Sequence, residues 1–303
     1  MKMFDIDFVV TYVDSKDPSW FKDYMEYAKE DGREVNRNSV RFRSWDTLKY
    51  QLRGIETYMP WIRNVYLIVS STSQVPDFIN TETVHVITHD MIIPEKYLPT
   101  FNSNTIELFM YKIEGLSEHF IYSNDDIYAI GDLKPEDFFT ENGDPKVIVR
   151  ERRKKYDNIY IQTISNTRDL CLLENKKKLQ SNLLLRSDHS MNPMLKSTWE
   201  MYWKKHKDKL ENSISTFRTS KNISQEISNY HHYLSAPNIH GVRRSKYFQF
   251  KNESATRFYD VLFSKEFDIC CMNDANVLDF NLAKRIIISM FRKKHPNKSK
   301  YEN

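Results

Sequence analysis

The sequence predicts an α/β protein with a Rossmann-like, mainly parallel sheet flanked by helices and an added helical part toward the C-terminal end. Short segments rich in β-branched and aromatic residues alternate with segments whose apolar residues recur at helical spacing. The strand-like segments are apolar almost throughout, which is typical of parallel strands that are buried on both faces. The chain has 303 residues, 40% hydrophobic and 14% aromatic, and can therefore bury a sizeable core.

The first unit, residues 1–145, is expected to carry most of the sheet. In chain order we expect a strand, a helix, two strands, a helix and a strand. The strands are expected at residues 6–14, 64–71, 84–88 and 119–123, and the helices at residues 47–62 and 105–116. Gly115 marks the end of the second helix.

The pattern loosens after residue 145. We expect a basic connector over 146–186, a helical part over 187–280, and a basic C-terminal helix and tail over 281–303. The helical part should begin with a helix at 190–210, because Pro193 suits the first turn of a helix. Further elements are expected as a helix at 222–235, capped by Thr219 or Ser220, and a strand at 267–272.

The sequence has no mark of membrane insertion or export. No apolar run approaches the roughly 20 residues that cross a bilayer, and Asp5 and Asp7 interrupt the place of a signal-peptide core. We therefore expect a cytoplasmic protein. Cys171, Cys270 and Cys271 fit neither a disulfide framework nor the spacing of a zinc site, so we expect reduced thiols.

Positive charge is distributed unevenly in this chain, whose net charge is +4. Basic runs at 150–155, 176–178 and 291–300 are typical of solvated surface, and peripheral contact with an anionic membrane is the functional alternative. Within 284–300 the cations accompany apolar residues, as in a helix that lies on a membrane; a terminal helix packed on the core with a disordered basic end fits equally well. Nucleic acid is not expected, because zinc-finger spacing, an RNP-like strand and tandem repeats are lacking.

Acidic and amide side chains follow three of the expected strands. They are Asp14 and Asp17, then Asn124, Asp125 and Asp126, and finally Asn273 and Asp274. Ligands bind beyond the carboxyl ends of the strands in sheets of this kind, so we expect these groups to converge. Helix capping or turn formation explains any single one of them, but it explains a converging set less well.

Four blocks of the sequence carry a resemblance to a known family. They are residues 6–20; residues 41–70, 88–94, 98–107 and 115–126; residues 186–199 and 215–224; and residues 270–276. In this order they resemble the Stealth family of hexose-1-phosphate transferases, and LPTFNS…IE…FIYSNDD is the most specific combination. The family includes bacterial capsule and cell-surface polysaccharide phosphotransferases and the catalytic part of the lysosomal-enzyme N-acetylglucosamine-1-phosphotransferase.

The resemblance implies a reaction. Hexose 1-phosphate would pass from a nucleotide diphosphate sugar, expected to be UDP-linked, to a hydroxyl of an oligo- or polysaccharide, and the nucleoside monophosphate would leave. The phosphoanhydride breaks and the sugar keeps its anomeric configuration, with residues 1–145 as the donor-binding half. A metal-dependent glycosyltransferase that uses the same type of donor is the alternative, and it would release the nucleoside diphosphate.

The resemblance also implies a Mg²⁺ (or Mn²⁺) cofactor on the donor phosphates. Asp125 and Asp126 would supply hard oxygen ligands, and Asp274 would join them from the fourth block. Asp126 and Glu107 match positions that are functional in the family. Apart from the resemblance, Asp125 also fits a turn or capping residue, and Glu107 fits an ordinary exposed glutamate.

Two further residues match catalytic positions of the third block. His189 matches the histidine expected to act as general base for the acceptor hydroxyl, and the ordinary histidine pKa of about 6.5 suits that task. Arg218 matches the family arginine and precedes a helix start, where its guanidinium and free backbone amides would hold an anion. Asn222 stands where relatives often carry an acid, which argues against a ligand role there.

The residues expected to bind the donor are Asp14, Asp17, Arg41, Arg53, Asn124 and Asn273. The arginines among them have a plainer alternative. Of Arg41, Arg43 and Arg53, two could simply pair with Asp46 or Glu56 on a helix face.

Overall fold

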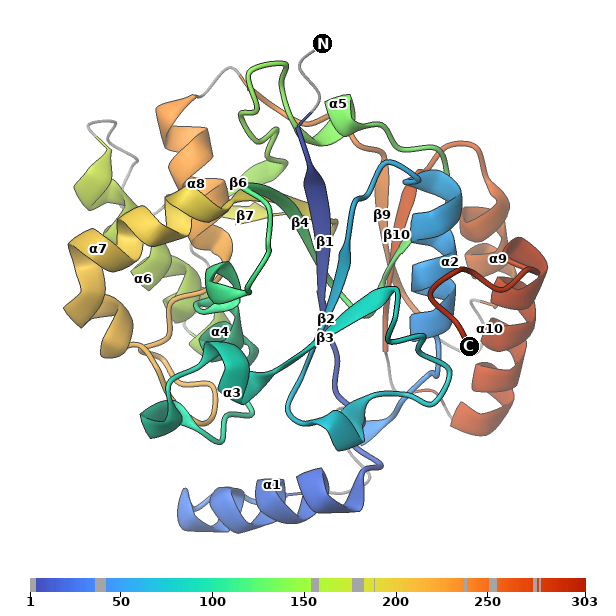
Figure 1. The fold of residues 1–303 in the computed structure, drawn as a ribbon, viewed down its shortest axis with the longest axis horizontal. Coiled ribbons are helices and arrows are strands. Elements are labelled where there is room, and N and C mark those ends of the chain that lie inside the picture. The colour runs from blue at the N-terminus through green and yellow to red at the C-terminus, as the bar shows by residue number, and fades with distance from the viewer. Residues whose placement is uncertain are drawn as a thin grey trace.

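The structure is a computed structural model that describes residues 4–35, 42–153, 158–175, 183–187, 189–236, 239–250, 255–274, 277 and 279–303. Its main sheet has five strands in the order β3-β2-β1-β4-β8. They are β1 (Ile6–Thr11), β2 (Val65–Val69), β3 (Val84–Thr88), β4 (His119–Asn124) and β8 (Asn192–Leu195). Only β8 is antiparallel to its neighbour, so the mainly parallel sheet is confirmed (Figure 1).

Helices flank this sheet, as expected (Figure 1). The helices of the described residues are α1 (Pro18–Glu30), α2 (Leu48–Tyr58), α3 (His89–Ile92), α4 (Ser103–Glu107), α5 (Pro135–Phe138), α6 (Ile159–Glu174), α7 (Lys196–Glu211), α8 (Glu226–Ser235), α9 (Ala255–Phe263) and α10 (Phe280–Lys294). α2 covers one face, and α4, α6, α7 and α8 lie on the side of the other. α1 lies beyond the carboxyl ends of the strands.

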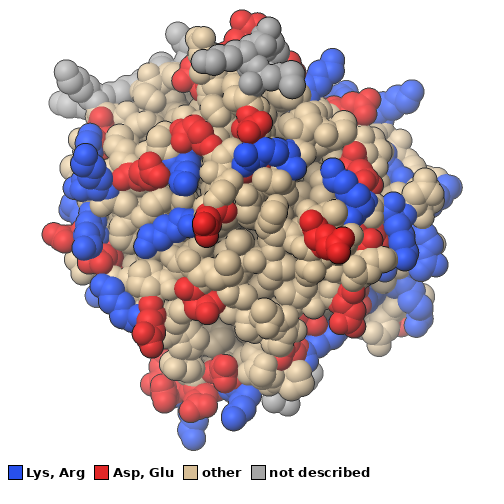
Figure 2. Space-filling view, viewed as in Figure 1, with Lys and Arg blue, Asp and Glu red and all other residues tan. Residues whose placement is uncertain are grey.

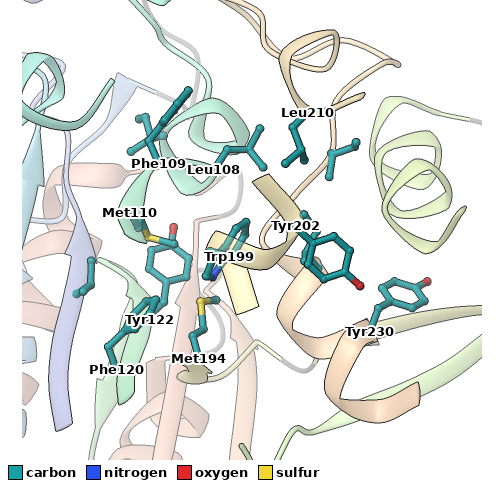
Figure 3. Packing of buried hydrophobic residues seen from close by; sticks show 14 of the residues in the cluster. Leu108, Phe109, Met110, Phe120, Tyr122, Met194, Trp199, Tyr202, Leu210 and Tyr230 are labelled. Carbon is teal, nitrogen blue, oxygen red and sulfur yellow. The ribbon is translucent and has the colours of Figure 1, made fainter. Parts of the chain in front are cut away.

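The alternation of side chains along each strand feeds two cores. In β1, Phe8 and Val10 pack in the cluster that contains α2, whereas Val9 joins the cluster of α7 and α8. The second cluster surrounds Trp199 and Tyr122, both fully buried (Figure 3). Burial on both faces explains why these strands read as continuous apolar runs.

Two smaller sheets complete the fold. β5 (Ile127–Ala129), β10 (Ile269–Asn273) and β9 (Ser245–Gln249) form a three-stranded sheet in that order. β6 (Val149–Arg153) pairs antiparallel with β7 (Leu183–Ser187). The strand expected at 267–272 is therefore confirmed as β10, and the segment 146–186 contains β6, α6 and part of β7.

The helix expected at 105–116 is wrong in extent. α4 ends at Glu107, and a separate 3₁₀ turn spans Met110–Lys112. Leu108 and Phe109, between the two, are only 1% exposed each, so the chain buries this apolar run in the core without continuing the helix. Other 3₁₀ turns lie at Thr72–Gln74 and Glu95–Tyr97.

The helix expected to start at 190 is also wrong at its beginning. Residues Asn192–Leu195 form β8, in which Pro193 lies opposite Ile121 of β4, and α7 begins at Lys196. Proline lacks a backbone N–H and is tolerated on an edge strand, which is where β8 lies. A proline is thus compatible with both a helix start and an edge strand. Here the pairing of residues 192–195 with β4 places Pro193 in a strand.

The basic C-terminal segment is packed on the protein. α10 buries Ala283, Ile287 and Phe291 in a core with α9. After the helix, Tyr301 is 3% exposed, and Glu302 forms an isolated β-bridge with Ile79. The apolar stripe is therefore occupied by the core, and the disordered end that we considered is wrong.

None of the described helices combines the length and apolarity needed to cross a bilayer.

Candidate active site

The candidate site lies at the carboxyl ends of β1 and β4. These strands are neighbours, with Thr11 opposite Asn124, although β2 and β3 lie on the other side of β1. The chain thus changes direction across the sheet between β1 and β4, which is where ligands bind in open α/β sheets. Asp14 follows β1 at this edge, and its backbone N–H and C=O both bond to the side chain of Gln74.

Asp125 and Asp126 form the turn between the main sheet and the second sheet. β4 ends at Asn124, and β5, which begins at Ile127, pairs with β10 instead. The side-chain amide of Gln51 donates to the backbone oxygens of Asn124 and Ile127, each at 2.7 Å, and so fixes both ends of the turn. The two carboxylates therefore lie at the point where the chain passes from the main sheet to the second sheet.

Both carboxylates are held in surroundings that disfavour their charge. Burial, together with the charge of Asp126, raises the pKa of Asp125 to about 7. Burial raises the pKa of Asp126 to about 6, although the Cys271 thiol donates to its Oδ2 at 3.6 Å. Among the described residues Oδ1 of Asp126 has no hydrogen-bond partner. A buried oxygen without a partner beside a second carboxylate matches the needs of a divalent cation.

The third expected metal ligand is engaged elsewhere. Asp274 pairs with Arg43, whose Nη2 lies 2.9 Å from Oδ1. In the part of the chain that the structure describes, no group of three or more His, Cys, Asp or Glu side chains is placed to hold a metal ion. The fit for Mg²⁺ thus rests on Asp125 and Asp126, and phosphate oxygens or water must supply the remaining ligands.

Glu107 is joined to the edge of the sheet through one tyrosine. The hydroxyl of Tyr122 lies 3.3 Å from Oε1 of Glu107 and 3.0 Å from Oδ1 of Asn124. Glu107 is only 6% exposed, so the exposed glutamate that we considered as an alternative is wrong. Burial raises the pKa of Glu107 to about 7. The hydrogen bond from the backbone N–H of Gln225 and the positive charge of Arg218 act in the opposite direction but do not cancel this rise.

Arg218 and Glu107 are placed at opposite ends of α4. Nη2 of Arg218 donates to the hydroxyl of Ser103, the first residue of that helix, at 2.6 Å. The loop that carries Arg218 is tied to the helix by Asn222, whose Oδ1 accepts from Nδ2 of Asn102 and from the backbone N–H of Thr219. Asn222 is fully buried, and its role is to hold this loop.

His189 approaches the acidic turn through an aromatic contact. Its exposed ring stacks on Tyr247 of β9, with 4.3 Å between the centroids. Tyr247 lies opposite Cys271 of β10, and the charge of Asp126 is one of the causes, after burial and Cys271, that raise its pKa. His189 and Asp126 therefore both lie near the same tyrosine.

Several expected donor-binding residues have partners within the protein. Asp17 caps α1, where it accepts from the backbone N–H groups of Ser19 and Trp20 and from the side chains of Ser73 and Gln74. Burial would raise its pKa, but these hydrogen bonds hold it far below the ordinary aspartate value.

The expected arginines and Asn273 are placed as follows. Arg53 forms a two-pronged ion pair with Glu302, which was neither of the partners considered for it. Asn273 ends β10, opposite Gln249. Arg41 lies outside the described residues. Donor contacts by these residues stay a prediction.

Tyr122, Tyr247 and Gln51 also belong to the site, and none of them was predicted from the sequence. Tyr122 had a signal, because residues two apart in a strand share a face and Asn124 is the second residue after it. Tyr247 and Gln51 had none, since their contacts join segments far apart in the chain.

Comparison with known proteins extends the likeness over the whole chain. Residues 41–147 match the family described as Stealth protein CR2, conserved region 2. The receptor polysaccharide phosphotransferase WefC of Streptococcus oralis is 32% identical over 98% of this chain and 99% of its own. The capsular polysaccharide phosphotransferase WcwK of Streptococcus pneumoniae is 31% identical over 98% and 99%. The exopolysaccharide phosphotransferase cps2G of Lactiplantibacillus plantarum is 29% identical over 99% and 96%.

Solved structures resemble the chain only distantly. A galactosyltransferase, LgtC, in complex with donor and acceptor sugar analogs, aligns with a TM-score of 0.38 at 10% identity, covering 88% of this chain and 86% of that one. A likeness of this degree is too weak to bear on function.

Proposed function

The chain belongs to the Stealth family of polysaccharide phosphotransferases, and on that basis we propose that it transfers hexose 1-phosphate from a nucleotide diphosphate sugar to a glycan hydroxyl. The product is a phosphodiester in a capsular or cell-surface polysaccharide. The observation that carries the proposal is the pair Asp125 and Asp126 at the carboxyl edge of the sheet, with one buried oxygen left without a partner in the described residues. A cation bound to a donor diphosphate would satisfy that oxygen and both charges.

The acidic pair and Arg218 are proposed to bind the donor. Asp125 and Asp126 would hold Mg²⁺ or Mn²⁺, which when bound neutralises charge on the diphosphate. Arg218 offers its guanidinium to a phosphate oxygen, and its hydrogen bond to Ser103 of α4 holds the side chain in place. Asn124 offers a side chain to the same edge, and Tyr122 fixes its orientation. We propose a UDP-linked donor.

His189 is proposed to act on the acceptor. An imidazole nitrogen takes the proton of the acceptor hydroxyl as its oxygen attacks the phosphorus that carries the sugar. The phosphoanhydride bond breaks, the new P–O bond forms, and the nucleoside monophosphate leaves with the electron pair. The sugar–oxygen bond is untouched, so the anomeric configuration is kept.

The released nucleotide tests this function. Purified protein is incubated with Mg²⁺, a panel of UDP- and GDP-sugars and the glycan acceptor, and the nucleotides are separated by ion-exchange chromatography. We expect release of a nucleoside monophosphate in an amount equal to that of the modified acceptor. Release of the diphosphate would instead establish the glycosyltransferase alternative.

We also propose a cytoplasmic location at the inner face of the membrane, with contact through surface charge alone. The exposed cations of α10 and the tail are Arg285, Arg292, Lys293, Lys298 and Lys300. Basic side chains gather on the side of the molecule where α9 and α10 lie (Figure 2), and an anionic leaflet attracts such a surface. The expected result is pelleting with anionic vesicles at low salt only; equal pelleting with neutral vesicles, or none, would exclude this contact.

A further inference from the structure

A cavity lies against α1, at the carboxyl edge of the main sheet. Its volume is about 520 Å³, within the range of small-molecule sites. Trp20 and Tyr27 of α1 and Phe101 supply aromatic walls, and Ser70 and Ser71, which follow β2, supply hydroxyls. The cavity thus lies at the same carboxyl edge of the sheet as the acidic turn.

The charge of this cavity is negative. Four carboxylates line it, those of Asp23, Glu26, Asp90 and Glu95, and no lysine or arginine is among its lining residues. Figure 2 shows acidic side chains gathered at the lower edge of the molecule, where α1 lies in Figure 1. Such a lining repels phosphate groups, and its carboxylates can accept hydrogen bonds from the hydroxyl groups of a neutral ligand.

His89 is a second, independent indication of a ligand. Its side chain lines the cavity and is only 7% exposed, yet it makes no hydrogen bond to the described residues. Burial lowers its pKa to about 4, so the imidazole is neutral at pH 7 and offers one donor and one acceptor. A hydroxyl group that enters the cavity could bond to either ring nitrogen.

The wall of the cavity is continuous with the candidate active site. The ring of Phe101 stacks on Phe217 with 5.4 Å between the centroids, and its backbone N–H donates to Thr216. Phe217 is followed directly by Arg218 in the chain. A glycan bound in the cavity would therefore lie along the loop that presents this arginine.

We propose that this cavity binds a neutral hexose unit of the acceptor glycan. The proposal rests on the function proposed above and places the acceptor apart from the donor. Trp20 and Phe101 would pack against the C–H face of the sugar, and His89 with the serine hydroxyls and carboxylates would bond to its hydroxyl groups. A cavity that accepts only neutral sugar units would decide which unit of the growing glycan is presented for transfer.

Binding to simple probes tests the site without any need for turnover. The probes are methyl glycosides of glucose, galactose and N-acetylgalactosamine, with UMP as the nucleotide probe, observed by saturation-transfer NMR. We expect wild-type protein to bind at least one glycoside, Trp20→Ala and His89→Ala to weaken that binding at least tenfold, and Trp20→Phe to restore part of it. UMP binding should be unchanged in all three variants.

A matched control uses Trp203, which lines a separate cavity together with Tyr97 and Tyr111. Trp203→Ala should leave glycoside binding as in the wild type, and thermal melting confirms that each variant is folded. Absence of glycoside binding to the wild type, or its persistence in both variants, would overturn the proposal. Loss of UMP binding in Trp20→Ala would also overturn it and assign the cavity to the donor. None of these results depends on which nucleotide the enzyme releases, so the two proposals fail separately.

Discussion

The hydroxyl of Tyr122 lies 3.3 Å from the carboxylate of Glu107. The same hydroxyl lies 3.0 Å from Oδ1 of Asn124 and 3.2 Å from Oγ1 of Thr11, and its one proton cannot serve both the carboxylate and the amide oxygen. A protonated Glu107 resolves this, because it can donate to the tyrosine while the tyrosine donates to Asn124. The raised pKa of Glu107, about 7, agrees with such a chain.

Replacing the tyrosine tests this relationship. Tyr122→Phe removes the hydroxyl and leaves Asn124 free to turn, so we expect turnover to fall about tenfold at a loss of about 1 kcal/mol in the free energy of unfolding. The pH profile of turnover should also change in the limb near pH 7, where Glu107 titrates. Tyr111→Phe, away from the sheet edge, is the control. Wild-type turnover with an unchanged pH profile in Tyr122→Phe would show that the hydrogen bonds from Glu107 through Tyr122 to Asn124 have no role in the reaction.

Asp126→Asn should abolish transfer and stabilise the metal-free protein. The pKa of Asp126 is raised from 3.8 to about 6 in the folded state, so folding favours its protonated form. Its contribution to stability is therefore present at low pH and is lost as the pH rises through about 6. At pH 8 the metal-free variant should melt at a higher temperature than the wild type, and the difference should vanish near pH 4.

Magnesium provides the second measurement on this variant. Mg²⁺ should raise the melting temperature of the wild type through binding to the folded state, and it should not do so for Asp126→Asn. Asp77→Asn, an exposed carboxylate, is the control and should behave as the wild type. A folded Asp126→Asn enzyme with near wild-type turnover at saturating Mg²⁺ ends the metal assignment.

His189→Ala should lose turnover and keep its affinity for the donor. A general base acts in the chemical step and contributes typically 10²–10⁴-fold. Added imidazole should restore part of the rate, and His85→Ala, at an exposed histidine, serves as control. If the variant instead loses donor affinity at unchanged turnover, His189 belongs to the nucleotide site and another residue is the base.

Glu302→Ala should destabilise the whole fold. Arg53 and Glu302 are 11% and 3% exposed, and removing one partner of a buried pair leaves the other charge uncompensated, which costs about 3–5 kcal/mol. Denaturant unfolding measures this loss, with the exposed Glu82→Ala as control. If Arg53 also contacts the donor, as the sequence predicts, the folded fraction should show a raised KM for the donor; an unchanged KM would remove Arg53 from the donor site.

The core strands and the acidic edge could be predicted from the sequence because their signals are local. β1 to β4 are apolar runs, and acids of the candidate site come shortly after β1 and directly after β4. α1 has a local start signal in Asp17 and Pro18 but no buried apolar face, since its only buried residue is Ala28. Arg53 finds its partner 249 residues away, and Pro193 lies in a strand only because β4 offers an edge, so neither outcome could be read locally.

The fate of the phosphate that carries the sugar tests the central claim most directly. The donor is a UDP-sugar labelled with ³²P in its β-phosphate, incubated with the wild-type enzyme, Mg²⁺ and the glycan acceptor. We predict that the label enters the polysaccharide and that unlabelled UMP is released in equal amount. Label that appears in released UDP, with none in the polysaccharide, would contradict the account.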